Sequence, residues 1–186
     1  MKHLATCIAM LAACCTSAQA AEWRMDPAGS SLAFDSSYDG EAFVGRFARF
    51  EPAITLDPAD PEATAITVTI DLASVDTGNS ERDGTLATAD FFWTSNFPQA
   101  QFATTHCVAG AATGAIDCDA QLTIRDKTVT LPFRLQFADN GDGATLKAVT
   151  RVDRLVFGIG GGDWADTDLI PAEVVIRVDL VLRRKS

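Results

Sequence analysis

Apolar residues at every second position are the feature that most constrains how this chain can fold. Strict alternation runs through residues 66–72, 129–137 and 174–182. In residues 129–137, for example, Val, Leu, Phe, Leu and Phe alternate with Thr, Pro, Arg and Gln. This pattern is typical of strands with one buried face and one face in water. No strand is followed by a long helical segment, so a doubly wound nucleotide-binding fold is excluded.

Turn residues separate these strands from fainter ones, which we expect over residues 30–38, 43–56, 100–108, 115–125 and 144–157. Asp-Gly at 39–40, a Pro-rich stretch at 58–61 and a Gly/Asp/Asn loop at 139–143 provide the breaks. About eight strands joined by short turns predict a β-sandwich or a β-barrel. Residues 79–93 interrupt the pattern, and Asn79 or Ser80 is placed to cap a short helix there.

Charge excludes several classes of partner. The chain has 186 residues, with 15 Lys and Arg against 25 Asp and Glu, which gives a formal net charge of −10. A nucleic-acid-binding protein needs a basic surface to neutralise phosphates, and docking onto anionic lipid headgroups needs one too. We therefore expect no nucleic-acid partner.

The first twenty residues have the anatomy of an export signal. Lys2 and His3 precede an apolar run over residues 4–15, and Ala18-Gln19-Ala20 is a small-x-small cleavage site. The run is too short to span a bilayer. We therefore predict a signal peptide over residues 1–20 and one mature domain over residues 21–186. Lipid anchoring at Cys14 is a less favoured alternative, because a lipobox ending there leaves a very short apolar region.

Two cysteines, Cys107 and Cys118, remain after the leader. An even pair in an exported protein predicts a disulfide. Two free buried thiols are an alternative, and a zinc site with His106 lacks a fourth ligand. Placing the cysteines directly opposite each other puts Phe102 on the wrong face of its strand, so a bulge or a shifted register is needed to bring it inside.

Catalytic motifs are sparse. His106 is the single histidine after the leader, and no G-x-S-x-G motif accompanies it. The glycines at 158–162 lack the Gly-Lys-Ser/Thr ending of a phosphate-binding loop. The acidic residues at 139–142 and 163–168 lack the ligand spacing of a calcium loop. We expect no enzyme activity, no catalytic residue and no metal site.

Large apolar side chains are the remaining distinctive feature, with 11 Phe among them. One interpretation is a tightly packed core. The other is a barrel whose lumen holds an apolar ligand. A long hydrocarbon suits the second, because burying each CH₂ contributes about 0.8 kcal/mol.

A series of short motifs runs from Trp23 to Leu182 and includes Asp26-Pro27, Gly45-Arg46-Phe47, residues 70–78, Arg82-Asp83, Ala89-Asp90-Phe91-Phe92, residues 97–102, residues 122–126 and Phe157-Gly158-Ile159-Gly160. In order and spacing this series resembles the YceI-like family of periplasmic, lipocalin-like, polyisoprenoid-binding proteins. The resemblance implies an eight-stranded antiparallel barrel with one short helix, a long apolar tunnel, and a binding or carrier role without catalysis.

The resemblance also implies which residues form the site. Those that match apolar family positions, and are expected to line the lumen, are Phe34, Phe47, Leu72, Phe91, Phe92, Phe97, Phe102, Leu122, Phe133 and Phe157. Arg82 and Asp83 match a polar pair near the short helix. They would either orient the polar end of a lipid or pin the helix to the rim of the barrel.

Two functional hypotheses follow. The first is a carrier whose only bound group is an isoprenoid lipid, either a polyprenyl compound or a quinone. The second is an accessory module with a packed lumen, with a respiratory or stress-related role, that acts through a membrane partner. Residues 160–167 resemble a subgroup associated with cytochrome b561-type partners, and this resemblance implies a quinone-related or a respiratory accessory role. Gly29 occupies the place where many relatives carry a His, so any role of that imidazole is absent.

Overall fold

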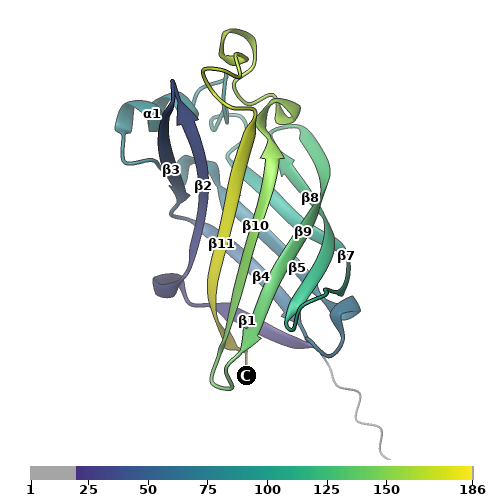
Figure 1. The fold of residues 1–186 in the computed structure, drawn as a ribbon. Helices are drawn as coiled ribbons and strands as arrows, with labels where there is room; N and C mark the ends of the chain where they lie inside the picture. The colour runs from purple at the N-terminus through teal and green to yellow at the C-terminus, as the bar shows by residue number, and fades with distance from the viewer. Residues whose placement is uncertain (1–19, 186) are drawn as a thin grey trace, which may run out of the picture.

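One antiparallel sheet dominates the computed structural model, which describes residues 20–185 (Figure 1). The strands are β1 (Ala21–Met25), β2 (Ser31–Tyr38), β3 (Glu41–Phe47), β4 (Phe50–Leu56), β5 (Ala65–Asp71), β6 (Val75–Asp76), β7 (Gln99–Ala109), β8 (Ala115–Ile124), β9 (Lys127–Asp139), β10 (Ala144–Asp153) and β11 (Glu173–Arg184). The α-helix is α1 (Ser80–Leu86), and the 3-10 segments are η1 (Pro27–Gly29), η2 (Pro61–Ala63), η3 (Leu72–Ser74), η4 (Arg154–Phe157) and η5 (Gly162–Trp164). The expected export segment, Cys14 included, lies outside the described residues apart from Ala20.

The sheet closes into a barrel. Eight strands follow one another as neighbours in the order β1-β4-β5-β7-β8-β9-β10-β11, and β11 pairs back onto β1, with Met25 opposite Leu182. Every pairing is antiparallel. The predicted eight-stranded antiparallel barrel with one short helix is confirmed.

The remaining strands extend the barrel at its upper end in Figure 1. Strand β2 pairs with β11, β3 pairs with β2, and β6 pairs with β3 at only two positions. Beyond β6 the chain leaves the sheet to form α1 and the loop of residues 87–98. The turn between β2 and β3 is the predicted Asp39-Gly40, with positive φ angles of 48° and 77°. Positive φ at both positions is typical of a tight hairpin turn.

The lower end of the barrel is filled by its own side chains. The rings of Trp23 and Phe137 meet edge to face with centroids 5.2 Å apart, and the Trp23 indole N–H donates to the Leu56 carbonyl at 3.1 Å. Leu146 and Leu182 are almost fully buried beside them. The hydrogen bond satisfies the indole N–H, so the large ring can occupy the interior without a desolvated donor.

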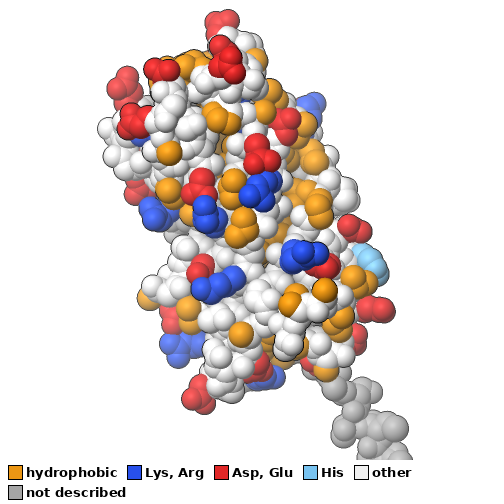
Figure 2. All heavy atoms as spheres, in the orientation of Figure 1, with side chains coloured by type: hydrophobic (Ala, Val, Ile, Leu, Met, Phe, Trp, Pro, Cys, Tyr) orange, Lys and Arg blue, Asp and Glu red, His pale blue; other side chains and the backbone are white. Residues whose placement is uncertain are grey.

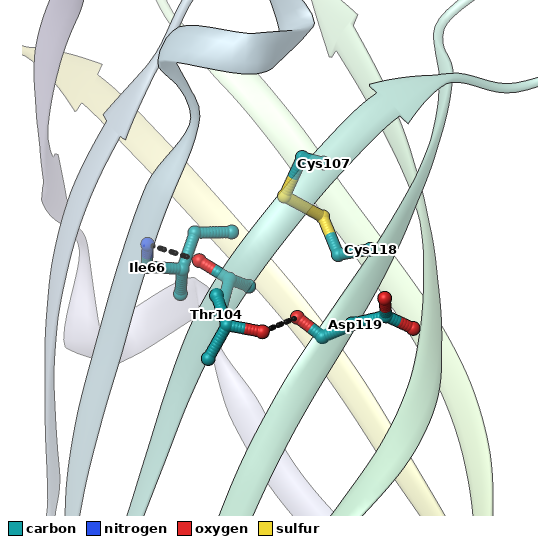
Figure 3. The surroundings of a disulfide bond; sticks show 6 residues. Ile66, Thr104, Cys107, Cys118 and Asp119 are labelled. Atoms are coloured by element: carbon teal, nitrogen blue, oxygen red, sulfur yellow. Dashed lines mark hydrogen bonds between the residues drawn. A yellow bond between two sulfur atoms is a disulfide. The ribbon is translucent and has the colours of Figure 1, made fainter.

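Strands β7 and β8 carry the predicted disulfide between Cys107 and Cys118 (Figure 3). The cysteines face each other in register, and the pairing shifts between Thr104 and His106. Because of this bulge, Phe102 pairs with Leu122 and lies on the inner face. Both the disulfide and the irregularity that the inward Phe102 required are confirmed.

Charged side chains of both signs are scattered over the outer face, and acidic ones gather at the upper end (Figure 2). Cross-strand ion pairs such as Lys147–Asp179 at 3.1 Å lie on the wet faces of the alternating strands. Among residues 20–185, no helix has the length and apolarity needed to cross a membrane.

Candidate functional site: an apolar cavity in the upper barrel

A cavity of about 470 Å³ occupies the upper half of the barrel. Its walls come from β2, β3, η3, α1, the loop after α1, and the upper ends of β5, β7, β8, β10 and β11. Residues of the segment 154–170, which follows β10, also line it. A cavity of this size and apolar character is typical of a small-molecule site.

Seven of the ten apolar residues expected in the lumen line this cavity: Phe34, Phe47, Leu72, Phe91, Phe92, Leu122 and Phe157. They arrive from six different elements or loops, so no short stretch of sequence forms the site. The structure brings them together because each lies on the inner side of the upper barrel.

The other three residues lie outside the cavity lining. Phe102 and Phe133 pack against each other with centroids 4.7 Å apart, and Phe97 packs against Trp93 at 5.6 Å. The implied long tunnel is therefore an upper chamber above a packed lower half. The physical reason is the bulk of the Phe102 and Phe133 rings, which fill the interior where smaller side chains would leave a channel, whereas Phe97 belongs to the loop after α1.

One wall is a stack of aromatic rings that depends on a glycine. The Phe34 ring packs against Phe47 at 5.7 Å and against Phe43 at 6.3 Å. Phe34 pairs with Gly45 across the β2–β3 ladder, and a Cβ on Gly45 would lie 2.2 Å from the ring. The absence of a side chain at Gly45 thus lets the ring lie flat over the neighbouring strand.

The mouth of the cavity is polar. Exposed lining residues cluster at the β2–β3 turn and at the start of α1, and include Glu41, Asn79 and Glu81. Arg82 also lines the cavity, and its guanidinium carbon lies 4.0 Å from the centre of the Phe43 ring. Its buried Nε has no hydrogen-bond partner among residues 20–185. Arg82 therefore places a guanidinium with a buried, unpartnered Nε at the boundary between the apolar chamber and water.

Asp83 has a different role from Arg82. Its Oδ1 accepts hydrogen bonds from the backbone N–H of Thr77 at 2.9 Å and from the Thr77 hydroxyl at 2.7 Å. Asn79 caps the same helix, accepting from the N–H groups of Glu81 and Arg82 at 3.0 and 3.1 Å. Asp83 thus holds the short helix in place, while Arg82 faces the cavity.

Arg154 is the residue that the sequence analysis missed. Although only 4% exposed, its guanidinium donates five hydrogen bonds to backbone carbonyls, at 2.5–3.1 Å. The acceptors belong to Ile159, Gly160, Trp164, Ile170 and Pro171. Burial lowers the pKa of Arg154, and the nearby charge of Asp153 partly opposes this shift.

These five bonds hold the loop of residues 155–172 over the cavity. The sequence feature that could have revealed this role is the position of Arg154, which follows an apolar strand and shortly precedes the glycines at 158–162. Gly160 has a φ of +62°, and a Cβ there would lie 2.5 Å from the guanidinium. Glycine therefore lets the loop wrap closely around the buried cation.

The arrangement suits binding. His106 lies exposed on β7, away from the cavity. In the described part of the chain, no three His, Cys, Asp or Glu side chains gather as a metal site requires. What the cavity offers chemically is apolar surface on nearly all sides and a hydrogen-bond donor at one end.

Comparison with known proteins gives a consistent result. The model of the YceI-like domain matches residues 23–182. A UPF0312 protein of Shewanella baltica is 32% identical over 176 residues, covering 89% of this chain and 87% of its own length. A UPF0312 protein of Pseudomonas putida is 33% identical over 155 residues, covering 77% of this chain and 79% of its own.

Two solved structures share the fold. Burkholderia cenocepacia BcnA has a TM-score of 0.81 at 30% identity, covering 85% of this chain and 99% of its own. A polyisoprenoid-binding domain from Saccharophagus degradans has a TM-score of 0.70 at 20% identity, covering 89% of this chain and 99% of its own.

Proposed function

Because the chain belongs to the YceI-like domain family, we propose that it is an exported, periplasmic carrier of one isoprenoid-type lipid, a polyprenyl compound or a quinone. The observation that carries the proposal is the apolar chamber in the upper barrel, with a polar mouth beside α1. The polyisoprenoid-binding domain of S. degradans, which shares this fold, supports the ligand class.

The energetics favour an apolar chain. Each CH₂ moved from water into the chamber contributes about 0.8 kcal/mol, whereas a net hydrogen bond contributes about 1 kcal/mol. Affinity therefore comes mainly from the chain, and the mouth selects among head groups. Arg82 is the residue we assign to the polar end, because its Nε is buried without a partner and a quinone or phosphate oxygen can accept from it.

Trp164 provides a direct test. It lines the cavity and packs against Phe91 with centroids 5.5 Å apart, so a quinone entering the cavity should quench its fluorescence. We expect saturable quenching by decylubiquinone, with one equivalent bound per chain, and a smaller signal in Trp164→Phe. Mass spectrometry of an organic extract of the native protein should recover an isoprenoid in near-equal amount.

Arg82→Met tests the head-group assignment. We expect it to weaken quinone binding about tenfold, the equivalent of one hydrogen bond. Arg46→Met is the matched control, because Arg46 is exposed on the neighbouring strand β3 and does not line the cavity. If both variants bind the quinone with equal affinity, Arg82 does not contact its head group.

The accessory-module hypothesis makes the opposite prediction. It proposes a lumen filled by protein side chains and action through a membrane cytochrome-type partner. Protein purified empty, with no quenching by quinones and no uptake of prenyl alcohols, would favour it over the carrier. The open upper chamber is the observation that favours the carrier.

A further inference from the structure

We propose that Phe102 and Phe133 set the length of the prenyl chain that the barrel accepts, so that its preferred guest is a short-chain prenyl compound. In this arrangement the aromatic pair lies directly beneath the lowest lining residues and acts as a floor below them, and further isoprene units of a longer chain stay outside the mouth. This inference rests on the proposed function and specifies its ligand.

The floor is located by following the inner faces of the strands downward from the cavity. On β7, Ala100 lines the cavity and Phe102 is the next inward residue. Two residues along a strand correspond to about 7 Å. On β5, Ile70 lines the cavity and Val68, the next inward residue, pairs with Phe102. The lining ends at the same level on both strands.

The two rings meet across the strand between them. Phe102 is on β7 and Phe133 is on β9, with β8 in the middle. Ala120, fully buried on the inner face of β8, is small enough for the rings to approach each other above it. Their centroids lie 4.7 Å apart at an interplanar angle of 61°. This edge-to-face contact is a favourable aromatic geometry.

The β-bulge makes this floor possible. Without the register shift between Thr104 and His106, a direct Cys107–Cys118 pairing would place Phe102 opposite Thr123 and outside the barrel. With the shift, Phe102 pairs with Leu122, whose side chain lines the cavity. The bulge therefore turns an aromatic side chain into the lumen, which is a known use of bulges near binding sites.

Below the floor, buried side chains occupy the described part of the barrel interior. The disulfide lies beside Phe133, because Cys118 is the in-register partner of Phe133 on β8, and Cys107 is only 1% exposed. Below it the Trp23–Phe137 pair fills the lower end. A chain that passed the floor would have to displace both.

A ladder of prenyl alcohols tests the length limit, using competition against decylubiquinone quenching of Trp164. For the wild-type protein we expect affinity to rise by at least about tenfold from geraniol to farnesol, because the added unit is buried. It should then level off, with geranylgeraniol and solanesol within about twofold of farnesol, because added units remain in water.

Phe102→Ala should let affinity keep rising with chain length for one more isoprene unit. The ring that it removes has about as many carbons as one isoprene unit, so geranylgeraniol should bind at least about tenfold more tightly than farnesol. Phe137→Leu is the control: it removes buried aromatic bulk below the floor and should leave the limit unchanged. If Phe102→Ala fails to fold, as judged by its thermal transition, Phe102→Leu should give a smaller shift in the same direction.

Two results would overturn the length limit while leaving the proposed function in place. One is wild-type affinity that continues to rise through solanesol. The other is a folded Phe102→Ala or Phe102→Leu variant with an unchanged limit. A wild-type protein that binds no prenyl alcohol and no quinone would instead remove the proposed function, and the length limit with it.

Discussion

At the scale of single residues, Arg154 shows how a buried charge can organise a binding site. All five of its N–H donors are used by carbonyls of one loop, and that loop covers the cavity. Guanidinium suits this role because its donors are fixed in one plane and point in several directions. A lysine has three donors on a single atom and cannot reach the same set of carbonyls.

Arg154→Lys should therefore destabilise the protein by about 2–4 kcal/mol, because it leaves buried carbonyls without donors. Urea denaturation followed by circular dichroism measures this loss. Arg151→Lys is the control, since Arg151 lies on the same chain segment, is exposed, and pairs with Glu173 at 3.1 Å. That control should stay within about 0.5 kcal/mol of wild type. Equal stability of the two variants would contradict the assigned role.

At the scale of elements, the β7–β8 hairpin combines a disulfide, a bulge and the cavity floor. Thr104 Oγ1 accepts from the backbone N–H of Ile66 on β5 at 2.9 Å (Figure 3). The Thr105 hydroxyl donates to the Asp119 carbonyl at 3.2 Å. These two hydrogen bonds tie the residues at the bulge to β5 on one side and to β8 on the other. The irregular segment is therefore anchored on both sides.

Loss of the disulfide should cost about 3 kcal/mol, the expected value for a loop of this size. We expect the Cys107→Ala, Cys118→Ala double variant to unfold at lower urea concentration than the oxidised wild type. Adding dithiothreitol should lower the wild-type midpoint toward that of the variant and leave the variant unchanged. A variant as stable as oxidised wild type would show that the β-ladder alone determines the stability of this hairpin.

At the scale of the whole molecule, the barrel depends on one seam between the ends of the described chain. Strands β1 and β11 pair over three positions, flanked by Asp26–Arg183 at 2.8 Å and Glu22–Lys185 at 2.9 Å. Hydrogen bonds from Arg183 lower the pKa of Asp26, and those from Lys185 lower the pKa of Glu22. Because both ion pairs lie at the surface, with Glu22 exposed and Asp26 half-buried, each contribution is small.

These lowered pKa values predict the direction of acid sensitivity. A carboxylate whose pKa is lower in the folded state stabilises the protein above its ordinary pKa, and this stabilisation is lost as the pH falls toward the folded-state value. The unfolding free energy should therefore decrease as the pH drops below 4.5 and then 3.8, the ordinary values of Glu and Asp.

Hydrogen exchange of the β1 and β11 amides across this pH range reports on the seam itself. The Glu22→Gln, Asp26→Asn double variant is the control, and its seam should exchange with less dependence on pH than that of the wild type. If hydrogen exchange at the seam depends on pH equally in the wild type and the variant, other carboxylates cause the acid sensitivity. Asp117 is one of these, because its hydrogen bond with Arg134 also lowers its pKa.

Much of this architecture is determined locally, and the sequence by itself predicts it. Alternation in residues 129–137 and 174–182 indicates which faces are buried, and Asp39-Gly40 predicts a hairpin turn, because backbone geometry links each of these to a few adjacent residues. The capped helix at Asn79 and the cysteine pair follow from similarly short patterns. The conflict between a direct Cys107–Cys118 pairing and an inward Phe102 even predicted a bulge or a shifted register, and the structure has the bulge.

Only the tertiary structure decided where the barrel is hollow. Phe34 and Phe102 look alike in sequence, yet one lines the cavity and the other lies beneath it. The difference depends on which rings arrive from distant strands: Phe133 reaches Phe102, while Gly45 leaves room beside Phe34. Arg154 was missed for the same reason, since its five acceptors exist only once the loop folds around it. Periodicity reports which face a side chain occupies, but free volume depends on side chains that meet across the barrel.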